Sequence, residues 1–291
     1  MRGLLKAIMH LVGQMPVVFV EKVSHWSLWC ALRQQGRIGL VSRLREIEPD
    51  LTNQEDEALK GQPHGEYSDL KRRGLQTFQC ELMQREVSRL PNQQLTVADI
   101  GDSAGTHMLY LRHLVGDSHK LDTVSVNLEE RAVEKIRARG FKAVLGRAED
   151  LDLGGTLVDL FTSFEMVEHL HNPAIFLRRL ARRAGRARLL LTVPFLRRSR
   201  VGCHNVRWGN HGVIRAGDEH IFELSPADWK LLFLHSGWRV VHEDIYYQYP
   251  RLPILDMPLA WFWRKNDFEG FWGASLEIDA TFADRYMDWE E

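Results

Sequence analysis

Residues 95–106 read Leu-Thr-Val-Ala-Asp-Ile-Gly-Asp-Ser-Ala-Gly-Thr. The first six are mostly apolar or β-branched, which is typical of a buried strand. Residues 106–115 follow as a helical segment that Gly116 ends. A glycine-containing turn between a strand and a helix lets a ligand approach the backbone closely, because glycine adopts conformations that side chains disfavour. The stretch therefore predicts a ligand-binding turn.

The chain after this turn continues to alternate short apolar strands with helices. We expect the strands at 95–100, 122–126, 142–145, 157–163, 187–193 and 238–247, with a seventh within 275–282. Such alternation predicts an α/β fold with a mainly parallel sheet covered by helices on both faces.

The first part of the chain follows a different pattern. Residues 1–92 have no strand alternation and predict a helical N-terminal extension, whereas 93–291 predict the α/β domain. Two long stretches, 196–223 and 248–273, come after strands five and six and are expected to be irregular insertions. Since ligands of such sheets bind beyond the carboxyl ends of the strands, we expect these insertions to line a substrate site.

Composition excludes several classes of protein. The 291 residues are 44% hydrophobic and 26% charged with a formal net charge of −1, so the chain is neither a disordered chain nor a polyelectrolyte binder. Its three cysteines, Cys30, Cys80 and Cys203, are odd in number and far apart, and they predict a reducing compartment. No segment is long and apolar enough to span a bilayer, so we expect a cytoplasmic protein.

Residues 4–15 form an expected amphipathic helix. Lys6, His10 and Gln14 are spaced four apart and share one helical face, while the other positions are largely apolar. Such a helix can lie on the inner surface of a membrane or pack on its own domain, and both interpretations stay open.

Three motifs together resemble one enzyme family. The Gly-x-Ser-x-Gly run at 101–105 differs from the dinucleotide fingerprint and lacks the lysine of a phosphate-binding loop. It resembles motif I of class I S-adenosylmethionine-dependent methyltransferases. Residues 146–151, Gly-Arg-Ala-Glu-Asp-Leu, resemble that family's adenine-side turn, and 165–169, Glu-Met-Val-Glu-His, resemble its Glu-Val-x-Glu-His subgroup of quinone- and glycan-tailoring enzymes. The resemblance covers roughly residues 94–245.

The resemblance implies a Rossmann-like seven-stranded sheet and a set of residues that bind S-adenosylmethionine. Two positions depart from the family pattern. Asn127 stands where an acidic residue usually holds the ribose, and Arg147 replaces an acid; asparagine keeps hydrogen-bonding groups but loses the charge. The implied cofactor-binding residues are Asp99, Gly101, Ser103, Gly105, Asn127, Ala148 and Glu149.

Candidate catalytic residues lie in the turn after the fourth strand and before the last helix. His169, beside Glu165, is the first candidate for a general base, and His220 the second. Each also has a structural interpretation, as a hydrogen bond that fixes a turn or as a loop anchor. The spacing of the nearby group matches no common zinc pattern, so no metal is expected; its members are His204, His211, Asp218, Glu219 and His220.

Arginine is concentrated in one part of the chain. Residues 169–217 contain eleven arginines and no acid, whereas 266–291 contain eight acids. The two segments either pair with each other or leave an arginine wall that attracts an anionic acceptor. No RNA-binding module is recognisable, so no nucleic-acid partner is expected.

These observations predict an S-adenosylmethionine-dependent methyltransferase that methylates oxygen on a sugar or lipid-linked glycan precursor, as in polysaccharide biosynthesis. Two alternatives remain. One is a methyltransferase of quinone-like small molecules. The other is an inactive scaffold of the same fold at a membrane assembly, which the departures at Asn127 and Arg147 would favour.

Overall fold

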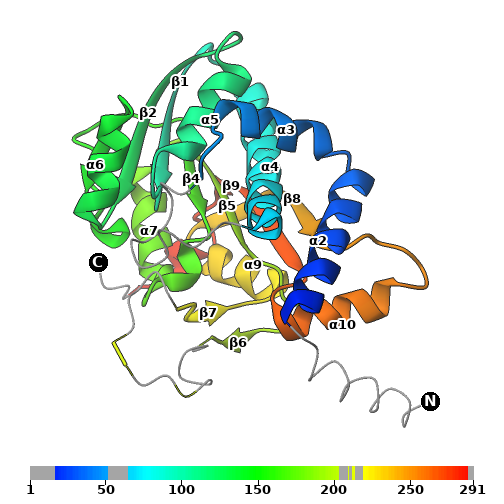
Figure 1. Ribbon diagram of the computed structural model, residues 1–291. Helices are drawn as coiled ribbons and strands as arrows, with labels where there is room; N and C mark the ends of the chain where they lie inside the picture. The colour runs from blue at the N-terminus through cyan, green and yellow to red at the C-terminus, as the bar shows by residue number, and fades with distance from the viewer. Residues whose placement is uncertain (1–16, 52–64, 203–208, 210–211, 214–218, 288–291) are drawn as a thin grey trace.

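The computed structural model describes residues 17–51, 65–202, 209, 212–213 and 219–287. Its centre is a seven-stranded sheet in the order β3-β2-β1-β4-β5-β9-β8 (Figure 1). The first five of these strands are parallel, and β9 runs antiparallel to both of its neighbours, β5 and β8. The predicted α/β sheet is therefore confirmed; its strands are β1 (Gln94–Ile100), β2 (Lys120–Asn127), β3 (Lys142–Leu145), β4 (Leu160–Phe164), β5 (Arg188–Pro194), β8 (Trp238–Tyr247) and β9 (Gly270–Ile278).

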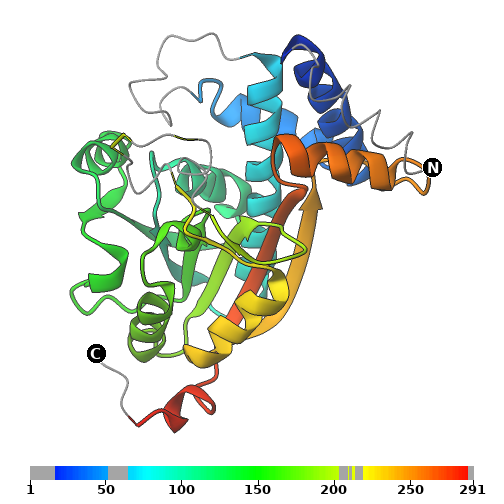
Figure 2. The ribbon, with the colours of Figure 1, turned by 90° about the horizontal axis from the view of Figure 1, so that it is seen from below.

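Helices cover both faces of this sheet. Alternate residues of β1 point to opposite faces, so that Val97 enters one apolar core and Ala98 the other. Helices α4 and α5 cover the first face and α7 and α9 the second (Figure 2). The helices are α2 (Val17–Gln34), α3 (Ile38–Ile47), α4 (Glu66–Arg89), α5 (Thr106–Val115), α6 (Glu130–Ala138), α7 (Pro173–Arg183), α9 (Pro226–His235) and α10 (Asp256–Asn266).

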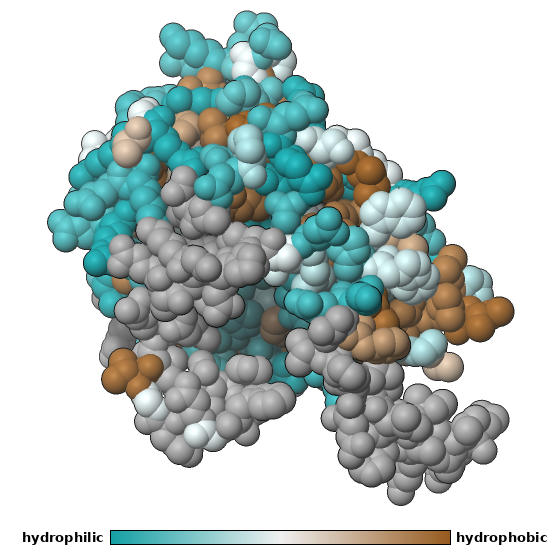
Figure 3. All heavy atoms as spheres, viewed as in Figure 1, coloured by the Kyte–Doolittle hydropathy of each residue, from teal (hydrophilic) through white to brown (hydrophobic). Residues whose placement is uncertain are grey.

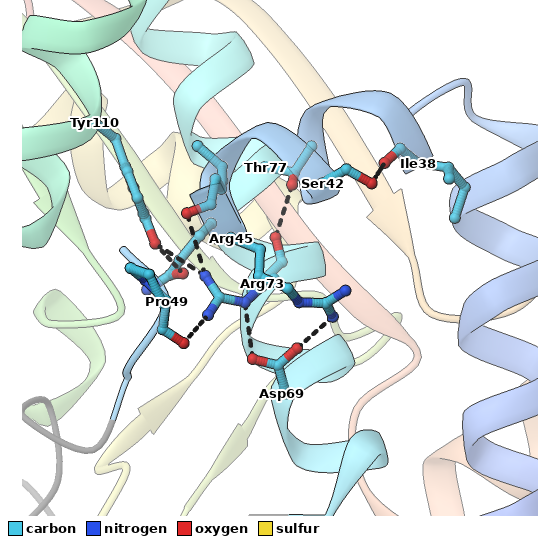
Figure 4. A network of polar contacts seen from close by, with 10 residues as sticks. Ile38, Ser42, Arg45, Pro49, Asp69, Arg73, Thr77 and Tyr110 are labelled. Carbon is cyan, nitrogen blue, oxygen red and sulfur yellow. Dashed lines mark hydrogen bonds and ion pairs between the residues drawn. The ribbon is translucent and has the colours of Figure 1, made fainter. Parts of the chain in front are cut away.

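The described helices of the N-terminal extension belong to the main core. Leu82 and Phe78 of α4 pack against β9 at Gly273, where a Cβ atom would lie 2.4 Å from Cδ1 of Leu82. Arg73 of α4 has no exposed surface; it donates to Asp69 Oδ1 at 2.7 Å and to the Pro49 carbonyl at 3.0 Å (Figure 4). Because this charge is fully paired inside the protein, it fixes α4 relative to the chain after α3.

The two expected insertions have different structures. In 248–273, which we expected to be irregular, α10 forms and β9 already begins at Gly270 rather than at 275. The prediction of irregular structure was wrong because the aromatic residues Phe271 and Trp272 pair with β5 and are buried. In 196–223, Arg200–Val201 (β6) pairs with Phe222–Glu223 (β7), and parts of the intervening chain lie outside the described residues.

Among the described residues, none of the helices is both long enough and apolar enough to cross a membrane. The predicted amphipathic helix at 4–15 lies outside the described residues.

Candidate active site

The loop between β1 and α5 contains two glycines in the left-handed region. The φ angle is +98° at Gly101 and +75° at Gly105. A Cβ atom at Gly101 would lie 2.7 Å from Cγ of Met166, in the turn after β4. Residue 101 must therefore be glycine both for its backbone angle and for its contact with Met166. The same contact places the turn after β4 directly against the loop.

Asp102 organises this loop from inside. Its Oδ1 accepts the backbone N–H groups of Ala104 at 3.1 Å and Gly105 at 2.7 Å, and its Oδ2 accepts the Ser125 hydroxyl at 2.7 Å. Burial and the nearby charge of Asp99 raise the pKa of Asp102. We did not single out Asp102 from the sequence, although an aspartate inside a turn commonly accepts backbone N–H groups two or three residues further on.

Asp99, a predicted cofactor residue, lies beneath the loop and is only 1% exposed. Its Oδ1 accepts the Thr162 hydroxyl at 2.8 Å, and its Oδ2 lies 3.2 Å from Nδ1 of His107. Both carboxylate oxygens are thus used inside the protein, and contact with a ligand would have to pass through these partners. Asp99 therefore supports the loop rather than lining its surface.

A chain of buried polar contacts continues from Asp99 to the turn after β4. Nε2 of His107 lies 3.1 Å from Oε1 of Gln79, and Nε2 of Gln79 donates to the Thr192 hydroxyl at 3.1 Å. Thr192 in turn hydrogen-bonds the Glu165 side chain. Burial works against the charge on His107, but the hydrogen bond to Asp99 and the charges of Asp99, Asp102 and Glu165 raise its pKa overall. Gln79 comes from α4, and no motif in the sequence marks it as part of a site.

Asn127 ends β2 at the same edge of the sheet. Its Nδ2 donates to the Asp102 carbonyl at 2.9 Å, and its Oδ1 accepts the backbone N–H of Glu129 at 2.8 Å. Asparagine thus supplies a donor that the usual aspartate lacks, and this donor helps to hold the loop. Ser103 is exposed, whereas Asn127 is half-buried.

The predicted adenine-side turn forms a short 3-10 helix, Ala148–Asp150. Its two candidate residues, Ala148 and Glu149, are half-buried. Arg147 forms an ion pair with Glu149 at 3.6 Å. Arg179 of α7 donates to the Glu149 carbonyl at 3.0 Å, so the helix on one face of the sheet fixes this turn.

Glu165 begins the turn after β4 in an unusual conformation. Its φ angle is +51°, and it is the only non-glycine residue with positive φ among the described residues. Burial is the main cause that raises its pKa to about 8. Its Oε1 is buried and has no hydrogen-bond partner among the residues that the structure describes. Backbone strain of this kind tends to occur at functional sites.

Glu168, His169 and His220 meet at this turn. One ligand-type atom from each lies within 4.8 Å of the other two. The rings of His169 and His220 are 4.6 Å apart in an edge-to-face arrangement. Glu168 has no exposed surface, and burial together with the charges of Glu165 and Glu223 raises its pKa well above the ordinary value. Two of the three candidate catalytic residues, His169 and His220, are therefore close together, with Glu168 beside them.

A polar contact at Nδ1 orients each imidazole ring, a hydrogen bond in His169 and a longer ion-pair contact in His220. Nδ1 of His169 lies 3.0 Å from the Glu219 carbonyl, and Nδ1 of His220 lies 3.6 Å from Oε1 of Glu223. His220 also stacks on Phe268, with ring centroids 5.4 Å apart. Of the other residues singled out in this insertion, His204, His211 and Asp218 lie outside the described residues.

The arginines after residue 169 are mostly paired within the chain. Arg178 pairs with Asp284 at 2.9 Å, Arg188 with Glu277 at 2.7 Å, and Arg197 with Glu269 at 2.9 Å. These three acids belong to the acidic segment 266–291, so the alternative in which the two segments pair is confirmed for these arginines. Arg198, which is exposed beyond β5, has no ion pair within the described part of the chain.

Comparison with known proteins agrees with this geometry. Residues 98–185 match the family model for a methyltransferase domain. Among solved structures, 1,6-didemethyltoxoflavin-N1-methyltransferase of Burkholderia thailandensis, with bound S-adenosylhomocysteine, is 12% identical over 70% of this chain and 78% of its own, with a TM-score of 0.50. The [4+2]-cyclase SpnF is 11% identical over 76% of this chain and 86% of its own, with a TM-score of 0.51. A search of curated proteins gave no match.

The fold and the matched segment together define a class I S-adenosylmethionine-dependent methyltransferase domain. The matched segment contains the glycine loop, the end of β2, the 148–150 turn and the turn after β4. The matched segment is thus part of a methyltransferase domain, whose methyl donor is S-adenosylmethionine. Because a cyclase has a similar fold, the likeness to solved structures by itself shows the fold and not the reaction.

The residues present fit this cofactor. The backbone of Gly101 and Ser103 is exposed at the carboxyl edge of the sheet, with no side chain on Gly101 to block a ligand. Leu128, directly after Asn127, is an apolar side chain that is 58% exposed, which suits contact with a flat aromatic ring. Polar groups for a ribose and an apolar surface for a base are thus adjacent.

Proposed function

We propose that this enzyme transfers a methyl group from S-adenosylmethionine to a hydroxyl oxygen of a sugar or of a lipid-linked glycan precursor. The observation that carries the proposal is the meeting of Glu168, His169 and His220 beside the glycine loop. A sugar hydroxyl is a weak nucleophile until it loses its proton, so a site for oxygen needs a group that takes up or displaces that proton.

The cofactor side of the proposal uses the loop and its neighbours. Gly101, Ser103 and Gly105 would lie along the cofactor's amino-acid part, and Asn127 beside the ribose. Ala148 and Glu149 would lie at the adenine. Asp99 would act through Thr162 and His107, since both of its carboxylate oxygens are already bonded to them.

The acceptor side uses the turn after β4. When bound, the cofactor supplies an electrophilic methyl carbon, and the carbon–sulfur electron pair returns to sulfur as S-adenosylhomocysteine forms. The Glu219 carbonyl at Nδ1 of His169 keeps the proton there and places the lone pair on Nε2. This lone pair, with Glu165 and His220 nearby, would remove the acceptor proton as the acceptor oxygen bonds to carbon.

Exposed apolar residues support an acceptor that carries a lipid. Trp26 and Trp29 of α2 are 48% and 41% exposed, and Ile254 and Met257 near α10 are 88% and 81% exposed. Figure 3 shows apolar side chains gathered on the side where Figure 1 places α10. Tryptophan suits a membrane interface because its ring is apolar and its N–H is polar. A peripheral contact of this side would bring a lipid-linked acceptor to the enzyme, and the exposed Arg198 would offer a positive charge to an anionic group on it.

The test is methyl transfer measured with purified acceptors. The formation of S-adenosylhomocysteine is followed with nucleotide sugars, lipid-linked glycan precursors and quinols. We expect turnover with one of the glycan classes, and the methylated position is then found by mass spectrometry. His169→Gln should lower kcat with little change in cofactor affinity, because the side chain acts on the acceptor.

Turnover with quinols alone would favour the small-molecule alternative. Cofactor binding without turnover on any acceptor, or no cofactor binding by the folded protein, would favour the inactive scaffold. The matched control is His171→Gln, an exposed histidine two residues after His169, which should not alter kcat.

A further inference from the structure

Glu168 is a buried acid whose side chain has no hydrogen-bond partner among the residues that the structure describes. Its residue has no exposed surface, and neither carboxylate oxygen accepts a hydrogen bond from another of the described residues. An ionised carboxylate in such a place is costly unless a positive charge lies beside it, and removing water from it without compensation costs several kcal/mol. The described surroundings of Glu168 include two acids, Glu165 and Glu223, which add to the negative charge.

Two imidazoles complete the set of ligand atoms. One atom each from Glu168, His169 and His220 lies within 4.8 Å of the others. A bound cation with bonds of about 2.1 Å brings such atoms to about 3–3.5 Å from one another, so small rotations of the side chains would close the site.

The Nδ1 contacts of the two rings, a hydrogen bond in His169 and an ion-pair contact in His220, resemble those of metal-binding histidines. Histidines that bind a metal through one nitrogen usually hold a carbonyl or carboxylate with the other. Nδ1 of His169 lies 3.0 Å from the Glu219 carbonyl, and Nδ1 of His220 faces the Glu223 carboxylate at 3.6 Å. In both rings this arrangement directs the Nε2 lone pair to the outer side of the ring, away from the bonded oxygen.

The backbone holds the two segments in place. The N–H of Ile221 donates to the Glu168 carbonyl at 2.8 Å, and the N–H of Gly202 donates to the Ile221 carbonyl at 3.0 Å. A Cβ atom at Gly202 would lie 1.7 Å from the His220 carbonyl, so only glycine fits there. The chain that carries His220 is thus fixed on both sides against the turn that carries Glu168.

A second cluster of acids and histidine, formed by Asp99, Asp102 and His107, differs from the Glu168 cluster in its hydrogen bonding. Asp99, Asp102 and His107 also bring their ligand-type atoms within 4.8 Å. Both oxygens of each aspartate and both ring nitrogens of His107 already have hydrogen-bond partners. That cluster is complete by itself, whereas the Glu168 carboxylate is not.

We propose that Glu168, His169 and His220 bind one divalent transition-metal cation of the Mn²⁺ or Zn²⁺ type. Two imidazoles and one carboxylate suit such ions better than Ca²⁺ or Mg²⁺, which prefer oxygen ligands. The remaining coordination positions would take the acceptor.

This inference rests on the proposed function for its chemical role and deepens it. A metal lowers the pKa of a bound hydroxyl, so the acceptor would lose its proton to water while its oxygen is held by the cation. The imidazoles then act as ligands, and the metal replaces them in activating the oxygen. No change of oxidation state is involved.

The test is a titration of the full-length, untagged and metal-stripped protein with Co²⁺, followed by visible absorption and by thermal unfolding. We expect a single Co²⁺ per chain, displaced by Zn²⁺ and raising the melting temperature. Glu168→Gln and His220→Gln should each weaken Co²⁺ binding by about 100-fold or more. Loss of a residue that only supports a metal ligand already lowers metal affinity by about 10–100-fold, and loss of a ligand should cost at least as much. His171→Gln should bind like the wild type.

The inference is overturned if the wild type takes up no stoichiometric Co²⁺, or if Glu168→Gln binds it as tightly as the wild type. Misfolding does not obscure the result, because Glu168→Gln replaces a buried acid that is costly to ionise with a neutral side chain of similar shape and should raise the melting temperature of the metal-free protein. Calorimetry with S-adenosylmethionine on the metal-stripped protein tests cofactor binding separately. The metal inference can therefore fail while the proposed function stands, and the reverse.

Discussion

The loop after β1 and the turn after β4 lie side by side but are built in opposite ways. In the loop, Asp102 accepts three hydrogen bonds and Asn127 uses both ends of its amide. In the turn, Glu165 has a positive φ and one buried carboxylate oxygen that no described residue hydrogen-bonds, and Glu168 has two such oxygens. The loop is complete without a ligand, whereas the turn has polar groups that only a ligand, a proton or an ion can satisfy.

The difference indicates that the loop serves to bind the cofactor and that the turn serves the chemical step. A preformed loop binds a cofactor without paying for its own ordering on binding. Buried and unsatisfied polar groups cost stability and are kept where chemistry needs them. Substitutions in the loop should therefore destabilise, and removal of charge from the turn should stabilise.

The largest effect is expected at Gly101. Gly101→Ala forces a side chain to φ +98° and places it 2.7 Å from Met166 Cγ, so it should weaken binding of S-adenosylmethionine by at least about 100-fold. Calorimetry measures this. Gly140→Ala is the matched control, because Gly140 has φ +78° with nothing within 4 Å of its Cβ position. Equal affinity in both variants would show that the loop does not bind the cofactor.

Asp102→Ala should destabilise the fold by about 3 kcal/mol, because it leaves two buried backbone donors without a partner. Asp102→Asn keeps Oδ1 as an acceptor, so it should lower the free energy of unfolding by less than Asp102→Ala does. Urea unfolding gives both values. If the two variants are equally stable, the bonds to Ala104 and Gly105 do not hold the loop together.

Substitution of Glu165 should stabilise the protein, in contrast to Asp102→Ala, and the size of this stabilisation should depend on pH. Its pKa is about 8 in the folded protein against a usual value of 4.5, so the folded state binds the proton more tightly than the unfolded state. Stability should fall as pH rises from about 4.5 to about 8. Glu165→Gln should remove this decline, so its gain in melting temperature over the wild type should be larger at pH 8 than at pH 5. A gain independent of pH would mean that Glu165 is already ionised at pH 5.

The smallest effect is expected at Asn127. Asn127→Asp introduces the acid that this family usually has, but it loses the donor to the Asp102 carbonyl. The two changes oppose each other, and each is worth about 1 kcal/mol, so cofactor affinity should change by less than about tenfold. A much larger gain would show that the amide merely weakens ribose binding and does not support the loop.

Several features of the fold followed from the sequence because they depend on local pattern. The first six predicted strands overlap the observed ones, since each is a short apolar run between glycines or helix caps. The start of β9 was missed because Gly270 and Gly273 weaken any local strand signal, and both are explained only by neighbours from β8 and α4. The helices before residue 92 were expected, but their place in the main core was not.

Residue patterns alone were enough to predict the class of fold and the glycine loop, and to mark Glu165 and His169 as candidates in the turn after β4. These depend on residue types at short range, where backbone preference and hydrophobic spacing act directly. Three features became visible only in the folded protein: Asp99 is covered, Gln79 of α4 reaches the loop through His107, and His220 meets Glu168, which is distant in the chain. Such contacts arise from the packing of whole elements, so no local pattern encodes which distant side chains will share a buried space.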